Sequence, residues 1–203
     1  MQRDTLGRYT FLTYGTNVAS ATMGSALLGR ILPTGSVDPS FGIHNLTAGL
    51  AAFGNKFNAW DLQLTGDGKI LVAGTVADRT VAGTSDAILA RFDASGNLDT
   101  TFGSGGVTSA RLPNNDNARA VLLQSDGRIV LVSDWSDFDF SPVRVVFVTR
   151  RFLADGQLDP TYGSGGIGQI ATSGAGSNLF CATLDSVSGN VVAAGSMLAR
   201  WLP

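Results

Sequence analysis

The sequence RFDASGNLDTTFGSGG occupies residues 91–106, and two further copies of it occur in the chain. The earlier copy is RILPTGSVDPSFG at residues 30–42, and the later copy is RFLADGQLDPTYGSGG at residues 151–166. A fourth copy begins at Arg200. Recurrence of one motif along a chain predicts a fold built from repeated structural units.

The period of the repeat is about 60 residues. The aromatic residues Phe41, Phe102 and Tyr162 lie 61 and 60 residues apart. A second motif, a glycine followed by an apolar and β-branched run, recurs with the same period. Its glycines are Gly7, Gly68, Gly127 and Gly189. Two motifs with one period indicate repeat units at about residues 1–42, 43–103, 104–163 and 164–203, in a single array.

Each period contains four predicted strands, which in one example are residues 107–112, 118–124, 128–132 and 143–152. The dipeptide Asp126-Gly127 between two apolar runs favours a hairpin, because glycine readily takes the positive φ that the turn requires. Four short antiparallel strands per repeat are typical of a propeller blade. We therefore predict an all-β, β-propeller-like array of four-stranded antiparallel blades, each burying its faces against its neighbours.

The number of predicted strands is about fourteen, or about 3.5 blades. In this interpretation the chain starts in the third strand of one blade and ends in the fourth strand of another, which makes an incomplete or open ring. Three readings fit this count: a fragment of a longer protein, two copies that together form a seven-bladed ring, or an open stack.

The repeated motif predicts a structural role for each of its residues. Aspartates at the start of a tight turn accept backbone N–H bonds, aromatic residues act as apolar plugs between blades, and each arginine pairs with the aspartate of its own or a neighbouring turn. The residues concerned are Arg30, Asp38, Phe41, Arg91, Asp99, Phe102, Arg151, Asp159 and Tyr162. The glycines that follow let the chain turn tightly, so we interpret residues 91–106 as the hinge between blades.

These motifs resemble the delta-60 repeat of bacterial proteins. The resemblance rests on GKILVAG at residues 68–74, LARF at residues 89–92 and the glycine-rich segment that ends at residue 106. It covers essentially the whole chain, most closely in residues 68–106 and 127–166. It implies a propeller-like array, usually in long secreted or cell-surface proteins, and it implies no catalytic residues.

Composition excludes several classes of function. Lys+Arg number 14 and Asp+Glu 16 among 203 residues, and the basic residues form no cluster, so no nucleic-acid partner is expected. The apolar runs are too short to insert into a membrane. His44 is the only histidine, which argues against a zinc site rich in histidine, and Cys181 is predicted to be a small buried strand residue. No cofactor is expected, with Ca²⁺ as the one alternative.

The loops fall into a regular set and a variable set, which an antiparallel blade places on opposite faces. Loops on a rigid scaffold commonly bind ligands. The variable loop after residue 133 contains Asp134, Trp135, Asp137 and Asp139, which are candidates for binding Ca²⁺ or a sugar ring. The alternative for this loop is a solvated acidic segment without a ligand. Trp60 and Trp201 lie in strand patterns and are predicted to be core residues.

These observations favour a non-enzymatic structural or protein-interaction scaffold from a secreted or cell-surface bacterial protein. Its partners would be further repeats of the same protein or another protein, and no oligomeric state follows from the sequence. Met1–Leu12 lacks the pattern of a signal peptide. One alternative is a carbohydrate- or calcium-dependent binding module that uses the variable loop face. Another is a fragment of a propeller enzyme.

Overall fold

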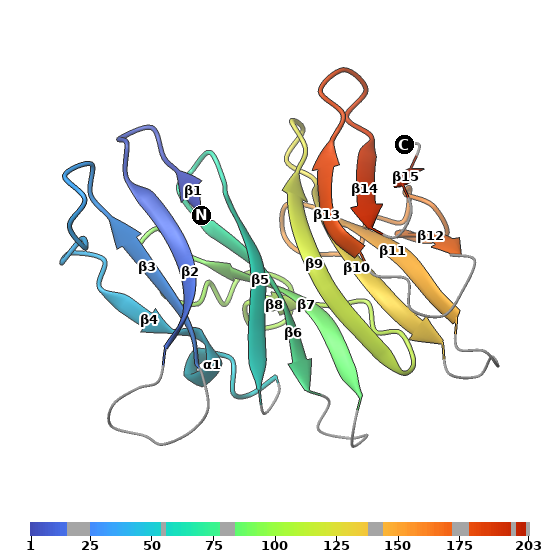
Figure 1. Cartoon of the computed structure of the whole chain (residues 1–203), viewed down its shortest axis with the longest axis horizontal. Helices are drawn as coiled ribbons and strands as arrows, with labels where there is room; N and C mark the ends of the chain where they lie inside the picture. Colours follow the sequence, from blue (N-terminus) through green and yellow to red (C-terminus); the bar gives the residue numbers. More distant parts are fainter. Residues whose placement is uncertain are drawn as a thin grey trace.

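The computed structural model describes residues 1–15, 25–53, 56–77, 84–137, 144–171, 179–195 and 198–201. Within these ranges the chain forms fifteen strands and one four-residue helix, α1 (Leu46–Gly49). The strands group into antiparallel sheets, with the first sheet on the left of Figure 1 and the last sheet on the right, where it overlaps the sheet before it. The predicted fold class, an all-β and open propeller-like array, is confirmed.

Four blades can be followed along the chain. The first contains β1 (Gln2–Arg3), β2 (Tyr9–Gly15), β3 (Ser25–Ile31) and β4 (Ile43–Asn45). The second contains β5 (Phe57–Leu64), β6 (Ile70–Ala77), β7 (Ser85–Phe92) and β8 (Val107–Thr108). The third contains β9 (Asn115–Leu123), β10 (Ile129–Asp137), β11 (Arg144–Phe152) and β12 (Ile167–Ala171). The described part of the fourth contains β13 (Leu179–Leu184), β14 (Val191–Gly195) and β15 (Leu198–Trp201).

Backbone strand pairing between the second and third blades is limited to one residue pair in the described part of the chain. By backbone hydrogen bonding they form one eight-stranded sheet, but the connection between them is a parallel bridge between Ser85 of β7 and Asn115 of β9. Within each blade the pairing is antiparallel and extensive, for example from Ile129 to Asp137 along β10 and β11. The eight strands are therefore two propeller-like blades whose strands pair at one edge point and whose side chains pack against each other.

The strand that follows each repeated motif belongs to the preceding blade. β8 pairs with β7, through Leu89 and Thr108, and β4 and β12 pair in the same way with β3 and β11. The prediction that residues 91–106 form a hinge between blades was therefore wrong, because the motif connects two strands within one blade. Its glycines explain the reversal: Gly105 and Gly106 have φ of 65° and 102°, which turns the chain back onto β7.

This pairing also changes where the first blade begins. Gln2 and Arg3 pair with β2 as the first strand of a blade, so the chain does not start in a third strand. At the other end β15 is the third strand of its sheet. The predicted repeat units describe the period of the sequence, and their boundaries stay a prediction. Each sheet begins and ends about one strand later in the chain than the sequence motifs suggest.

The hydrophobic core is divided into three clusters, and each lies between two neighbouring blades. The first joins Leu28 and Phe41 to Ile70 and Phe92 of the second blade. The second cluster contains Leu71, Leu89, Phe102, Ile129, Leu131 and Phe152, and the third contains Val130, Phe147, Val191 and Trp201. Burial of one such side chain stabilises a fold by about 1.5–3 kcal/mol. The prediction that each blade buries its faces against its neighbours is confirmed for these three junctions.

Two side chains differ from the sequence-based expectation. Cys181 is exposed rather than buried, and Trp60 is 50% exposed rather than part of the core. A register shift between Leu179 and Cys181 disturbs the inward and outward alternation of β13 at this point. Trp60 lies at a corresponding register shift in β5, between Ala59 and Asp61. Trp201 is 6% exposed and lies in the third core cluster, so its predicted core position is confirmed.

No helix among the described residues has the length and apolar character needed to cross a bilayer.

Candidate functional site

The repeated motif builds the same hydrogen-bonded turn in each blade. In the second blade, Asp99 accepts hydrogen bonds from the Thr101 amide at 3.2 Å and the Thr101 hydroxyl at 2.6 Å. Its other carboxylate oxygen lies 2.8 Å from Nε of Arg91. Asp38 and Asp159 make the corresponding contacts with Ser40 and Arg30, and with Thr161 and Arg151.

Each repeated arginine pairs with the aspartate of its own turn, and Arg30 and Arg91 also reach the next blade. Arg91 Nη1 donates to the carbonyl oxygen of Ala154 at 2.6 Å, and Arg30 Nη1 donates to that of Ala94 at 3.2 Å. Both guanidinium groups also stack over the aromatic plug of their own motif, 4.5 Å from the ring centroid. One arginine therefore holds three structures together: its strand, its turn and the neighbouring blade.

The plug itself completes the junction between blades. Phe102 is fully buried, and Gly156 of the next blade lies against its ring. The Gly103 amide donates to the Asp155 carbonyl oxygen at 2.8 Å across the same junction. At the first junction Gly96 lies against His44, whose ring packs edge-on to Phe41 with centroids 4.9 Å apart. His44 therefore has a packing role where two blades meet.

The motif carboxylates are strongly acidic. The hydroxyl of Thr161, followed by its backbone amide and Arg151, holds the pKa of Asp159 at about 2, below its ordinary value of 3.8. Ser40 and Arg30 lower the pKa of Asp38 to about 2 in the same way, and Thr101 with Lys69 and Arg91 lowers that of Asp99. A depressed carboxyl pKa means that the folded state prefers the ionised form.

Acid should therefore weaken the fold through these turns. A carboxyl whose folded pKa lies below its unfolded pKa adds stability above about pH 4, and this contribution is lost as the pH falls towards about 2. We expect Asp159→Asn to lower the free energy of unfolding at neutral pH, and this difference from the wild type to shrink between about pH 4 and about pH 2. Denaturant unfolding of both proteins across this range measures it. A difference that stayed constant with pH would contradict the assignment.

The acidic segment proposed as a ligand site is partly strand. β10 continues to Asp137, because Trp135 and Asp137 pair with Val146 and Arg144 of β11. Asp134 is 5% exposed, and its two oxygens lie 2.8 and 3.0 Å from Nε and Nη2 of Arg119. Asp139 lies outside the described residues. The one carboxylate that can be placed is thus already bound by a guanidinium in the bidentate manner.

The indole of Trp135 is also engaged, since its Nε1 donates to the carbonyl oxygen of Pro113. Arg119 lies over the ring of Trp60, 5.4 Å from its centroid, so this arginine links the acidic segment to the exposed Trp60 of the second blade. No group of three His, Cys, Asp or Glu side chains suitable for a metal occurs among the described residues. A ligand at Asp134, Trp135, Asp137 and Asp139 stays a prediction.

Two charged residues that the sequence motifs did not single out form the most deeply buried ion pair among the described residues. Arg150 is 0% exposed, and its Nη2 donates to Asp116, which is 1% exposed. Burial raises the pKa of Asp116, and Arg150 opposes this shift. The sequence contained a signal, because the positions equivalent to Arg150 and Asp116 in the second blade are Ala90 and Phe57. Two charged residues at positions that are apolar in another repeat predict a buried pair.

Two stretches of the chain match a known family of domains. Residues 65–102 and 124–162 match the model of a domain of unknown function (DUF5122) described as a β-propeller. Both matches start at the turn before a central strand, β6 or β10, and end at the aromatic plug, Phe102 or Tyr162. No curated protein matches the chain. The matches and the fold together support a β-propeller repeat family.

Proposed function

We propose that this chain is a non-enzymatic scaffold whose end blades pack against further propeller blades, either of the same protein or of another. The supporting observation is the exposure of positions that are buried between inner blades. Leu198 is 73% exposed, whereas the equivalent Leu89, also three residues before the aromatic end of its strand, is 0% exposed. Cys181 is exposed, whereas the equivalent Ala120 is 4% exposed.

The outer face of the first blade is complementary to the outer face of the last blade. Tyr9 is 36% exposed, although its equivalents Ile70, Ile129 and Val191 are each 2% exposed beneath a preceding blade. At each inner junction, a face equivalent to that of Leu198 and Cys181 packs against a face equivalent to that of Tyr9. The outer faces of the last and first blades therefore have matching chemistry. Because apolar burial supplies most of the stability of a contact between blades, a blade-like partner suits both faces.

Self-association tests the proposal with the chain alone. We expect the mass measured by sedimentation equilibrium to rise with protein concentration, because the outer face of the last blade binds the outer face of the first blade of another copy. Leu198→Asp should weaken this association roughly ten- to hundredfold, since it removes the burial of one leucine. Val187→Asp is the matched control, because Val187 is 95% exposed in the hairpin between β13 and β14, away from the sheet face.

A protein that stayed monomeric at every concentration would contradict the pairing of the two outer faces with each other, as would equal effects of the two substitutions.

The resemblance to the delta-60 repeat supports placing the scaffold in a secreted or cell-surface bacterial protein. Detection of the native protein only in the cytoplasmic fraction of its host would contradict that placement.

A further inference from the structure

A pocket recurs where the turns of two neighbouring blades meet. The pocket between the first and second blades has a volume of about 300 Å³, and the one between the second and third blades has about 180 Å³. Both are open at the end of the array that carries the repeated motif. Since the blades repeat, the two pockets are corresponding sites that differ only in their side chains and in the extra residues that line the larger one.

Most lining positions of the two pockets are equivalent. Arg8 and Arg30 of the first pocket correspond to Lys69 and Arg91 of the second. The apolar floor of the first is Leu64 and Ile70, and that of the second is Leu123 and Ile129. Each pocket thus combines two cationic side chains from one blade with an apolar surface from the next.

The charge balance differs between them. In the second pocket Lys69 and Arg91 both contact Asp99, at 3.1 and 2.8 Å, and Asp67 lies 3.8 Å from Lys69, so two cations meet two carboxylates. In the first pocket Arg8 contacts Asp4 at 2.7 Å and Arg30 contacts Asp38 at 2.8 Å.

Arg3 is the third cation of the first pocket, and it makes no ion pair with the described residues. Its guanidinium lies 5.8 Å from the ring centroid of Tyr9. The first pocket therefore has an excess of one positive charge.

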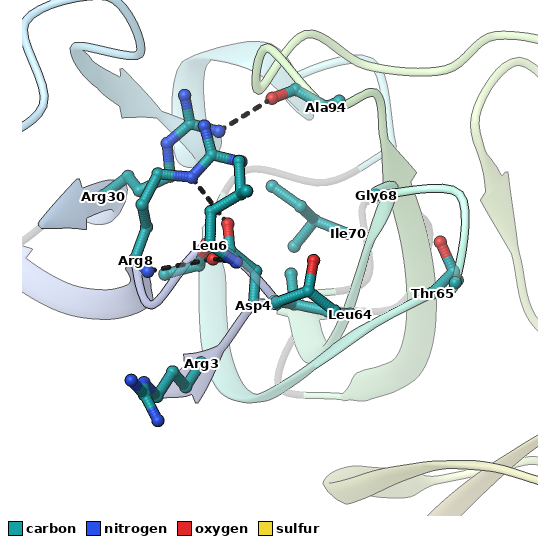
Figure 2. A pocket seen from close by; sticks show the side chains of 13 residues that line it. Arg3, Asp4, Leu6, Arg8, Arg30, Leu64, Thr65, Gly68, Ile70 and Ala94 are labelled. Carbon is teal, nitrogen blue, oxygen red and sulfur yellow. Dashed lines mark hydrogen bonds and ion pairs between the residues drawn. The ribbon is translucent and has the colours of Figure 1, made fainter. Parts of the chain in front are cut away.

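The arginines of the first pocket also keep unused donors. Arg8 bonds Asp4 through Nε only, at 2.7 Å, so both of its terminal nitrogens lack an acceptor among the described residues. Arg30 uses Nε and Nη1 for Asp38 and Ala94, which leaves Nη2. Figure 2 shows Arg8 and Arg30 on the side of the first blade, across the pocket from Leu64 and Ile70. Arg3 points away from them at the margin of the pocket.

From this geometry we propose that the pocket between the first and second blades binds a small oxyanion, a carboxylate or phosphate group carried on a compact apolar body. The oxyanion accepts hydrogen bonds from the free guanidinium nitrogens of Arg8 and Arg30, which is the strongest class of hydrogen bond in proteins. The apolar body lies on Leu64 and Ile70. A volume of about 300 Å³ suits a small molecule, because it is at the lower end of the range for ligand sites.

Phenyl phosphate is a suitable probe because it has both parts, and phenol is its uncharged control. We expect phenyl phosphate to cause saturable shifts of the amide signals of Thr10 and Ile70 in NMR spectra at low salt, and phenol to cause none. Arg8→Gln should weaken binding at least about tenfold, because it removes charged hydrogen-bond donors. Lys69→Gln removes a cation at the corresponding position of the second pocket and should leave the affinity unchanged.

Arg3→Gln keeps the test decisive if Arg8→Gln disturbs the hairpin that Asp4 stabilises. Arg3 holds the excess charge without an ion pair to the described residues, so this variant should keep its melting temperature and still bind phenyl phosphate more weakly. Absence of saturable binding by the wild type would overturn the proposal. Equal weakening by Lys69→Gln and Arg8→Gln would overturn it too, because it would show attraction by net charge alone.

Discussion

Arg150→Ala is expected to lower the free energy of unfolding by about 3–5 kcal/mol, the range for breaking a buried ion pair from one side. Arg150 is completely buried and donates from all three nitrogens: Nε to Ala110 at 2.8 Å, Nη1 to Ser133 at 2.7 Å, and Nη2 to Asp116. Its removal leaves a buried carboxylate whose other oxygen, Oδ1, already lacks a hydrogen-bond partner. Denaturant unfolding of the variant measures the loss.

The second blade provides the matched rescue. There the positions of Arg150, Asp116 and Ser133 are occupied by Ala90, Phe57 and Gly74. Glycine is necessary beside Phe57, since a Cβ at Gly74 would lie 2.1 Å from the ring of Phe57. The triple variant Arg150→Ala, Asp116→Phe, Ser133→Gly should therefore recover most of the lost stability, because it replaces a charged cluster by a set of side chains that already packs in a neighbouring repeat.

Two outcomes would contradict this account. A loss below about 1 kcal/mol for Arg150→Ala would mean that Asp116 is hydrated or protonated at little cost. A triple variant as unstable as the single one would mean that the junction between the second and third blades requires the charged cluster. Asp116→Ala, which leaves the guanidinium buried, tests the same pair from the other side.

The sequence predicts the repeat and the fold class because both depend on local signals. The period is visible in Phe41, Phe102 and Tyr162, and the Asp-Gly turns and β-branched runs identify strands without reference to the rest of the molecule. The chemistry of the motif is also local. Asp99 accepts from Thr101, two residues later, and from Arg91, eight residues earlier.

The pairing of strands into blades is not local, and the sequence predicts it incorrectly. Residues 107–108 come after a glycine-rich segment, which reads equally well as a link to a new blade or as a turn back to the old one. In the structure the chain turns back to its own blade, where the Arg91 amide donates to the Gly106 carbonyl oxygen at 3.0 Å. The predicted burial of two side chains is wrong for the same reason. Cys181 and Trp60 sit at register shifts in β13 and β5, which no alternating pattern reveals.

The candidate binding residues were chosen by composition, and composition does not show which carboxylates are free. Asp134 resembles a ligand in sequence, but Arg119, fifteen residues earlier, binds both of its oxygens. The pocket beside Arg8 was missed for the converse reason. Its residues come from four separate stretches of two blades, and it becomes visible only when the turns of the two blades are brought together.

Gly156→Ala is expected to cost about 3 kcal/mol or more, and Gly127→Ala only about 1–2 kcal/mol. Both glycines have positive φ, 89° and 84°, so both substitutions strain the backbone similarly. The two sites differ in what the new methyl group meets. At Gly127 nothing lies within 4 Å, whereas at Gly156 the methyl carbon would lie 2.8 Å from the Gly103 nitrogen and 2.9 Å from the Phe102 ring.

The difference between these two variants measures how firmly neighbouring blades are joined. Phe102 is fully buried, and the Gly103 amide is held by Asp155, so neither can move to admit a methyl group. The turn of the third blade must move instead, which breaks the bond from Thr108 Oγ1 to the Gly156 carbonyl oxygen at 2.8 Å and that from Arg91 to Ala154. Comparison of the two variants by denaturant unfolding removes the shared backbone strain. Equal losses would show that the blades adjust freely at this junction, and that the repeated motif stabilises each blade separately rather than the array.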